Sequence, residues 1–308
     1  MTQVEVLIRM DNYVVITQKN GIGYRTRRHV QAIAGRIIPN RIMAKLYYRI
    51  VMKDRLDLSA PTTFNQKIQW YKLNYCADND LVIQCSDKYA VREYVAACGY
   101  GKYLNGLLGV WDSVEEIDWD KLPRQFVIKC NHGCGYNIIC KDKTKLDVKK
   151  VDAILRRWMK QDFGLFNIEP HYSKIKKKIL CEQYIEPVDQ GSLQDYKIFC
   201  FNGVPKLIGV YSDRQSSLKR TFFDTEWNIA KVSKKAPEHE LAKPRLLDEA
   251  LSMSRKLSEP FPFVRVDLYD LENTIIFGEL TFSPAAGLSR SFVSVKPAVP
   301  SSSSPLMR

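Results

Sequence analysis

Two acidic side chains are spaced so that they would face each other across a β-hairpin. Residues 263–282 read FVRVDLYDLENTIIFGELTF, two strand-like runs around a polar turn. Because side chains alternate along a strand, Arg265 and Asp267 share one face of the first run, while the second run places Glu279 and Thr281 together. A central turn predicts Asp267 opposite Glu279, with Cβ atoms about 5 Å apart. The same register predicts Arg265 opposite Thr281.

Two interpretations of this hairpin are open. Facing carboxylates repel each other unless a cation lies between them, and hard oxygen ligands of this kind suit Mg²⁺, which binds one or two carboxylates together with substrate phosphates. Alternatively, the hairpin has a solvent-exposed polar face on which Arg265 neutralises Asp267. The first interpretation makes the hairpin a candidate magnesium site.

A second candidate site lies in the stretch FVIKCNHGCGYNIICKDK, residues 126–143. Lys129 ends an apolar strand, and the loop after it contains Gly133 and Gly135. A strand-held lysine can reach phosphate oxygens while the backbone N–H groups of the loop cover them. The loop has neither the Walker A sequence nor G-x-G-x-x-G spacing, so it is equally compatible with an ordinary hairpin turn.

The same stretch contains possible metal ligands, namely Cys130, His132, Cys134 and Cys140. The C-x-H-x-C arrangement lacks the usual spacing of two to four residues between paired cysteines, and no second knuckle follows. Strand alternation also points Lys129 and Cys130 to opposite faces. These points disfavour a structural zinc site.

A third candidate is the pair of strands CEQYIE and DYKIF. Glu182 could accept a hydrogen bond from a purine amino group, and Lys197 on the next strand is a second possible phosphate contact. Either residue could equally be an ordinary strand charge.

The elements that position these residues indicate an α+β architecture. Helices are expected at 61–74, capped by Thr63 with Gln66, and at 86–99, 149–161 and 244–257. A short helical turn is expected at 113–118. Strands are expected at 107–111, 125–130, 136–141, 179–186, 195–203, 204–212 and 219–224 and in the 263–282 hairpin. Helices and hairpin-connected strands in separate blocks are typical of α+β proteins.

The basic charge is concentrated near the N-terminus. The chain has 308 residues and a formal charge of +13, and residues 1–56 contain eleven Lys or Arg against three Asp or Glu. Residues 41–53 predict an amphipathic helix. Its basic stripe is Arg41, Lys45, Arg49 and Lys53, and its apolar side is Ile42, Met43, Leu46, Tyr47, Ile50 and Val51. Such a helix lies on an anionic membrane or partner, or packs on the protein with its basic face solvated.

The remaining bulk properties predict a cytoplasmic protein of two or three subdomains. The 45% of apolar residues can bury a sizeable core, and no apolar run approaches the roughly 18 residues that span a bilayer. The N-terminus has no signal-peptide pattern. The eight cysteines are expected to be free thiols, and the residues after 290 to form a disordered tail.

Taken in order, these parts resemble the ATP-grasp fold, and more closely the TupA-like ATP-grasp proteins of bacterial surface-polysaccharide clusters. The segments that carry the resemblance lie between Ile38 and Phe282: PTTFNQKIQWYKL, SDKYAVREYV, FVIKCNHGCGYNIICKDK, CEQYIE, DYKIFCFNG and VRVDLY…FGELTF. The resemblance implies an ATP-grasp fold with nucleotide between two α+β subdomains, preceded by a basic helical region. The expected divisions are 1–60, 61–124, 125–188, 189–290 and 291–308.

The resemblance also implies roles for particular residues. Lys129 would contact the α- and β-phosphates, and the loop Gly133–Tyr136, which includes Gly135, would be a mobile phosphate lid. The adenine would be bound by Glu182 and by the backbone near Tyr184 and Ile185. Lys197 would contact a phosphate and take part in catalysis, and Arg265 would stabilise the acyl phosphate. Mg²⁺ would be bound by Asp267, Glu279 and Thr281.

The activity implied is that of an ATP- and Mg²⁺-dependent carboxylate–amine ligase that acts through an acyl phosphate. Its carboxylate would be a uronic acid or amino acid of a cell-surface polysaccharide, with an amino acid or other amine as second substrate. The basic region would suit an anionic, lipid-linked acceptor at the inner membrane surface. The chain departs from the family in having Thr281 where E-x-N is common, and in its ending, SPAAGLSRSF.

Three other functions fit parts of the sequence. A non-catalytic module could bind an anionic polymer through the basic N-terminal half, although the aromatic residues do not interleave with the basic stripe as in single-strand nucleic-acid binders. A sugar kinase would use His132 or Asp195 as base. A glycosyltransferase is the third possibility, and the sequence has no convincing D-x-D motif. No nucleic-acid partner is expected.

Overall fold

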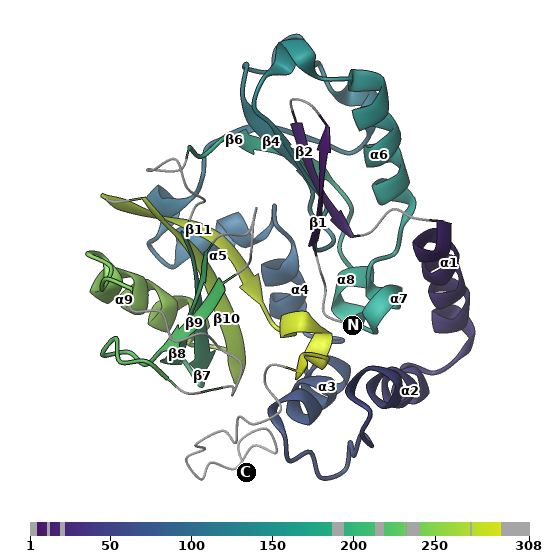
Figure 1. Ribbon diagram of the computed structural model, residues 1–308, viewed down its shortest axis with the longest axis vertical. Helices are drawn as coiled ribbons and strands as arrows, with labels where there is room; N and C mark the ends of the chain where they lie inside the picture. The colour runs from purple at the N-terminus through teal and green to yellow at the C-terminus, as the bar shows by residue number, and fades with distance from the viewer. Residues whose placement is uncertain are drawn as a thin grey trace.

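Two antiparallel sheets, with helices around them, form the framework of the protein (Figure 1). The computed structural model describes residues 5–10, 13–18, 22–186, 194–212, 219–230, 232, 241–271 and 273–290. Within these residues the sheets have six and five strands, and we call them the six-stranded and five-stranded sheets. This arrangement is the α+β architecture that the sequence predicts.

The six-stranded sheet combines strands from distant parts of the chain. In sheet order these are β1 (Glu5–Met10), β2 (Tyr13–Gln18), β5 (Asn137–Cys140), β4 (Phe126–Cys130), β6 (Ile179–Gln183) and β3 (Leu107–Trp111). Helix α6 (Val148–Lys160) packs on this sheet through Val151, Leu155 and Trp158, which recur at helical spacing and are fully buried. The helix begins where the Asp147 carboxylate accepts a hydrogen bond from the Lys150 N–H, at 3.1 Å.

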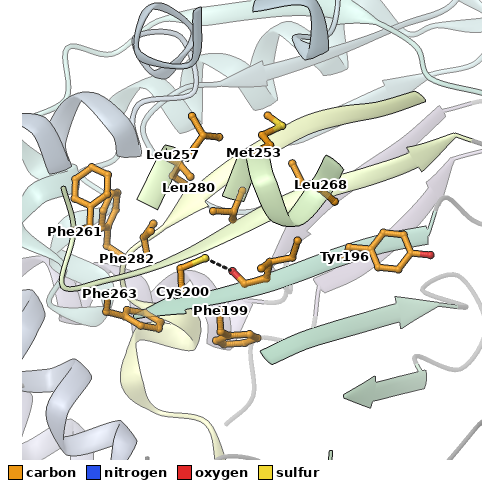
Figure 2. Packing of buried hydrophobic residues seen from close by; sticks show 14 of the residues in the cluster. Tyr196, Phe199, Cys200, Met253, Leu257, Phe261, Phe263, Leu268, Leu280 and Phe282 are labelled. Carbon is orange, nitrogen blue, oxygen red and sulfur yellow. Dashed lines mark hydrogen bonds between the residues drawn. The ribbon is translucent and has the colours of Figure 1, made fainter. Parts of the chain in front are cut away.

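The five-stranded sheet is formed by the C-terminal half of the chain. Its order is β11 (Thr274–Thr281), β10 (Phe263–Leu271), β7 (Gln194–Phe201), β8 (Val204–Ser212) and β9 (Lys219–Phe223). Helix α9 (Leu247–Ser258) covers one face, and Figure 2 shows Met253 and Leu257 of this helix above Leu268 and Leu280 of the sheet. Burial of these side chains fixes the β10–β11 hairpin against the helix.

The helical segments lie between and beside the two sheets. Their bounds are α1 (Ile22–Ile37), α2 (Asn40–Met52), α3 (Phe64–Asn74), α4 (Asp80–Ser86), α5 (Val91–Ala97), α7 (Gly164–Asn167) and α8 (Pro170–Ser173). Short 3₁₀ turns occur at Gly101–Tyr103, Val114–Glu116, Lys143–Lys145 and Pro284–Gly287. Helix α3 has the predicted capping box between Thr63 and Gln66. Among the described residues, no helix combines the length and the apolar character needed to cross a bilayer.

Helices α4, α7 and α8 were not expected from the sequence, and two of the expected elements differ in the structure. Residues 5–10 and 13–18 were expected to belong to a helical region, but they form strands β1 and β2, which pair with each other, and β2 also pairs with β5. The helix expected at 86–99 begins only at Val91, because the Asp87 carboxylate accepts the N–H groups of Tyr89 and Ala90 in a local turn. The tail expected after residue 290 lies outside the described residues.

Candidate active site

The β10–β11 hairpin has the register that the sequence predicts. Asp267 pairs with Glu279, and Arg265 pairs with Thr281. A bulge follows between Asp267 and Leu268, so the alternation of side chains shifts just beyond the two carboxylates. The four polar residues therefore share one face at the regular end of the hairpin.

Asp267 is the centre of a buried ion cluster. Its carboxylate accepts hydrogen bonds from Arg265 Nε and Nη2, both at 2.6 Å, and from Lys197 Nζ at 2.5 Å. Burial alone would raise the pKa of Asp267, but the charges of Arg265 and Lys197 hold that pKa below its ordinary value. The second interpretation of the hairpin is therefore right that Arg265 neutralises Asp267. It is wrong about solvent exposure, because Asp267 is only 4% exposed.

Lys197 is held in place from three directions. It lies on β7 directly opposite Asp267 in the sheet register. Asp195, two residues away on the same face, contacts its ammonium group at 2.9 Å, and the Tyr211 ring lies 5.2 Å from it. A lysine fixed in this way presents a preorganised positive charge beside the carboxylates of Asp195 and Asp267.

Glu279 and Thr281 complete an oxygen-rich donor set. Thr281 Oγ1 lies 3.0 Å from Glu279 Oε1, and Arg265 Nη2 lies 3.0 Å from Thr281 Oγ1. Two carboxylates and a hydroxyl fit Mg²⁺, whose other positions are commonly filled by phosphate oxygens and water. In the part of the chain that the structure describes, no three His, Cys, Asp or Glu residues gather as a metal site.

On the six-stranded sheet, two more predicted residues meet. Lys129 of β4 and Glu182 of β6 form an ion pair of 2.6 Å, with both side chains mostly buried. Arg92 approaches the same carboxylate at 3.8 Å, and Asn105 Nδ2 lies 3.4 Å from it. The residues predicted to bind phosphate and adenine are therefore held side by side.

The loop between β4 and β5 contains a glycine in the left-handed backbone conformation and a buried aromatic ring. Gly135 has φ 74°, a conformation that favours glycine. A Cβ on Gly133 would lie 2.7 Å from the Tyr136 ring and 2.8 Å from Phe163, so only glycine fits there. The Tyr136 ring stacks on Trp158 at 5.1 Å and is 6% exposed. Tyr136 thus anchors the loop, in which Gly133, Gly135 and Tyr136 are all buried, and the phosphate-covering role of this loop stays a prediction.

Lys88 is a candidate phosphate-binding residue that the sequence analysis missed. It lies between α4 and α5, and its Nζ donates a hydrogen bond of 2.5 Å to the carbonyl oxygen of Gly133. Its backbone N–H also approaches the Asn131 carbonyl, at 3.4 Å. The turn after Asp87 directs this lysine to a loop 45 residues away. The motif SDKYAVREYV contains the residue but gives no sign of that contact.

Tyr184 and Ile185, the residues expected to present their backbone to adenine, follow directly after β6 and are half-buried. Lys141 Nζ lies 5.8 Å from the centre of the Tyr184 ring. Their role in adenine binding stays a prediction.

A short connector joins the two groups of candidate residues. Leu104 forms a parallel bridge with Phe277 of β11, while the Gly106 carbonyl accepts the Gln183 N–H at 2.9 Å. Asn105 Nδ2 donates to the Gln183 carbonyl at 2.8 Å. The same three residues therefore attach the end of β6 to the hairpin that carries the carboxylates.

The segment after β11 is tied to helix α3, although its sequence looked atypical. Ala285, Ala286 and Gly287 have φ of 50°, 53° and 67°. Gln69 Nε2 and Lys72 Nζ donate to the Ala286 carbonyl at 2.8 and 2.9 Å. The polar residues of PTTFNQKIQWYKLN therefore hold this strained segment directly beyond Thr281.

The residues of the alternative zinc and kinase interpretations have structural partners. His132 is 1% exposed, and its Nε2 lies 3.1 Å from the Trp158 carbonyl. Burial raises the pKa of the Cys130 thiol to about 12. Asp195 is paired with Lys197, as described above. Neither proposed kinase base is presented to solvent.

Buried histidines predict a loss of stability in mild acid. Burial lowers the pKa of His132 to about 4 and that of His171 to about 3, against an ordinary value of 6.5. Between pH 6.5 and pH 4 the unfolded chain binds more protons than the folded one, so stability is complete above this window and falls as the pH falls. We expect each histidine to lower the free energy of unfolding by about 2 kcal/mol between pH 7 and pH 5.

Urea unfolding at pH 7 and pH 5 measures this effect. The variant His132→Gln should lose about 2 kcal/mol less than the unmodified protein over the same interval. An identical pH dependence in the two proteins would contradict a neutral, buried His132.

Comparison with known proteins decides the family. The model of the TupA-like ATP-grasp family matches residues 66–294, a range that includes every candidate residue above. The chain belongs to the TupA-like ATP-grasp family. The resemblance noted in the sequence is thereby confirmed, together with the ATP-grasp fold.

Solved structures of ATP-grasp ligases are also similar to this TupA-like chain, at low identity. D-alanine–D-alanine ligase from Bacillus anthracis, complexed with ATP, has 15% identity and a TM-score of 0.38, over 65% of this chain and 57% of that chain. The ATP-grasp ligase PsnB complexed with minimal precursor has 9% identity and a TM-score of 0.38, over 71% and 60%. N5-carboxyaminoimidazole synthase from Aspergillus clavatus has 11% identity and a TM-score of 0.39, over 66% and 45%.

The match therefore spans less than two thirds of the length of each of these proteins. PsnB has also been solved with Mg and ADP. A search of curated proteins found no match.

Proposed function

We propose that this TupA-like protein is an ATP- and Mg²⁺-dependent carboxylate–amine ligase. The observation that carries the proposal is the buried cluster of Arg265, Lys197 and Asp267, which faces Glu279 and Thr281 across the hairpin. Two fixed cations beside two carboxylates suit a reaction in which a metal-bound triphosphate transfers its terminal phosphoryl group. Membership of the ATP-grasp family supports this interpretation.

In this proposal the nucleotide lies between the two sheets. Lys129 and Lys88 contact its phosphates, and the backbone of Gly133–Tyr136 covers them. Glu182 and the backbone at Tyr184 and Ile185 bind the adenine. Because Lys129 is paired with Glu182 in the described structure, nucleotide binding replaces that ion pair with contacts from each residue to the ligand.

The reaction depends mainly on positioning and charge. Asp267, Glu279 and Thr281 hold the Mg²⁺ ion, which when bound neutralises charge on the transferring phosphoryl group. Lys197 and Arg265 supply fixed positive charge where the carboxylate substrate attacks the terminal phosphorus of ATP and ADP leaves. The acyl phosphate so formed is then attacked by an amine, which forms the amide and releases inorganic phosphate and a proton. None of these steps requires a nucleophilic side chain. Arg265 is the residue we assign to the acyl phosphate, since it lies on the metal-bearing face.

The substrates are proposed from the family alone. The carboxylate is a uronic acid or an acidic amino acid of a cell-surface polysaccharide, and the amine is an amino acid or a related compound. We place the reaction in the cytoplasm, where a lipid-linked acceptor at the inner membrane surface would be available.

Thermal unfolding with ATP tests the proposal at its first step. A ligand that binds only the folded state raises its stability by about 2.7 kcal/mol at one hundred times its dissociation constant, which corresponds to a rise of about 4 °C in the melting temperature of a chain of this length. We expect this rise with ATP and Mg²⁺ together, and a much smaller one with ATP and EDTA or with Mg²⁺ alone. No shift at millimolar Mg·ATP would remove the nucleotide site and with it the ligase proposal.

A further inference from the structure

Helices α1 and α2 expose an unusual amount of apolar surface. Large apolar side chains that are 46–76% exposed are concentrated on these two helices, and they are Val30, Ile33, Ile37, Ile42, Leu46 and Ile50. In the described parts of the chain, only Tyr89, Leu107 and Val204 are comparably exposed elsewhere. Single exposed apolar residues are ordinary, but a concentration on consecutive helices marks an interaction surface.

The exposed side chains are not the packing faces of the helices. On α2 the buried side is Met43, Ala44 and Tyr48, and the last two pack with Leu56 and Leu58. The expected apolar side of this helix is therefore divided, since Met43 faces inward, whereas Ile42, Leu46 and Ile50 recur every four residues on an outward stripe. The outward stripe is left without a partner within the described residues.

Helix α1 is arranged in the same way. Its inner side contacts α7, where Arg28 stacks on the Phe166 ring at 4.4 Å, and Gly35 lies against Leu165. Val30, Ile33 and Ile37 recur at i, i+3 and i+7 on a different side. Figure 1 shows α1 and α2 one after the other at the periphery of the molecule, away from the five-stranded sheet.

Positive charge surrounds these apolar stripes. The chain has no acidic residue between Asp11 and Asp54. On α2 each exposed apolar residue directly follows an exposed basic one, in the pairs Arg41–Ile42, Lys45–Leu46 and Arg49–Ile50. Arg27 and Arg36 are exposed on α1. The surface that we call the α1–α2 face therefore combines apolar side chains with charge of a single sign.

Charge of one sign selects among the possible occupants of this face. A second copy of the chain, docked through the same face, would bring the basic residues of both copies together and leave them unpaired. An anionic lipid surface satisfies both components, because the apolar side chains enter the acyl boundary while Arg and Lys remain among the phosphates. We propose that the α1–α2 face binds the surface of an anionic bilayer and holds the protein there peripherally.

Vesicle sedimentation without nucleotide tests this inference independently of the ligase proposal. The full chain should sediment with phosphatidylglycerol-containing vesicles and not with pure phosphatidylcholine vesicles at about 0.15 M salt. The variant Ile42→Ser/Leu46→Ser/Ile50→Ser and the variant Arg41→Ser/Lys45→Ser/Arg49→Ser should each lose binding. Since a basic residue near such a surface contributes about fivefold, the charge variant should lose about 100-fold. Leu107→Ser/Val204→Ser is the control and should bind normally.

The substituted side chains are exposed, so both triple variants should fold, which circular dichroism verifies. The inference is overturned if the unmodified protein ignores anionic vesicles, or if the apolar variant binds them as well as the unmodified protein does, since charge alone would then indicate a soluble anionic polymer. It is also overturned if light scattering shows a dimer that the apolar variant dissociates. Failure of ATP binding would leave this inference unaffected, and loss of vesicle binding would leave the nucleotide site unaffected.

Discussion

Replacing Asp267 by asparagine is expected to abolish the stabilisation by Mg·ATP and also to destabilise the protein itself. The carboxylate is 4% exposed and accepts hydrogen bonds from both Arg265 and Lys197. Among the described residues, its loss leaves Arg265 with the 3.5 Å contact to Glu279 as its one ion pair, while Lys197 keeps Asp195. Removing one partner of a buried ion pair typically lowers the free energy of unfolding by about 3–5 kcal/mol. Urea unfolding measures this loss, and thermal shift with Mg·ATP measures the ligand response.

The variant Glu279→Gln separates the loss of Mg·ATP binding from the loss of folding stability. The Glu279 side chain is 36% exposed, and its Oε1 atom makes the contacts to Thr281 and Arg265. Because a glutamine oxygen can replace Oε1 in these contacts, the free energy of unfolding of the variant should be unchanged. The variant should still lose the Mg²⁺-dependent part of ATP binding, and phosphoryl transfer should slow by about 100-fold, which corresponds to about 3 kcal/mol of lost charge stabilisation. The control is Glu226→Gln, which removes an exposed carboxylate from the turn after β9. If both variants of the metal pair keep normal Mg·ATP binding, the metal assignment is wrong.

Lys129→Met is expected to weaken ATP binding by about 10–100-fold, because a hydrogen bond to a charged group contributes about 1.5–3 kcal/mol. The Lys129 side chain is 18% exposed and is paired with Glu182 at 2.6 Å. Glu182 keeps Arg92 and Asn105 as neighbours in the variant, so the carboxylate is not left alone. Titration calorimetry with Mg·ATP gives the dissociation constants.

The matched control for this variant is Lys145→Met, which removes an exposed lysine from the same part of the chain. It lowers the net charge by the same amount, so it shows how much of the weakening of Mg·ATP binding comes from the net charge of the protein alone. Equal losses in the two variants would mean that Lys129 makes no specific phosphate contact. Lys88→Met should behave like Lys129→Met if the contact with Gly133 brings Lys88 to the phosphates.

The hairpin is where the sequence was most informative. Alternation along two strands and one tight turn are local properties, and they were sufficient to pair Asp267 with Glu279 in the observed register. The capping box of α3 was equally local, since both partners lie within one helical turn. Local periodicity also predicted α2. It could not tell which of the apolar residues of this helix are buried, as Met43 is, and which are exposed, as Ile42 is.

Contacts between distant segments were missed for the opposite reason. Lys88 reaches Gly133, and Lys72 reaches Ala286, only because a turn and a helix aim these side chains across the fold. The β1–β2 hairpin was not foreseen either, since its place is set by pairing with β5 more than a hundred residues later. No spacing within a segment encodes such a partner.

The sequence by itself therefore determined the strands that carry the candidate residues, the carboxylate pair and the family to which the chain belongs. Tertiary structure alone decided which charges are paired, because burial and pairing depend on groups brought together from separate strands. It buried Asp267 between Arg265 and Lys197, placed Lys129 on Glu182, and turned the Tyr136 ring into the core. The same folding left the α1–α2 face exposed, because packing against α3 and α7 uses only the inner sides of these two helices.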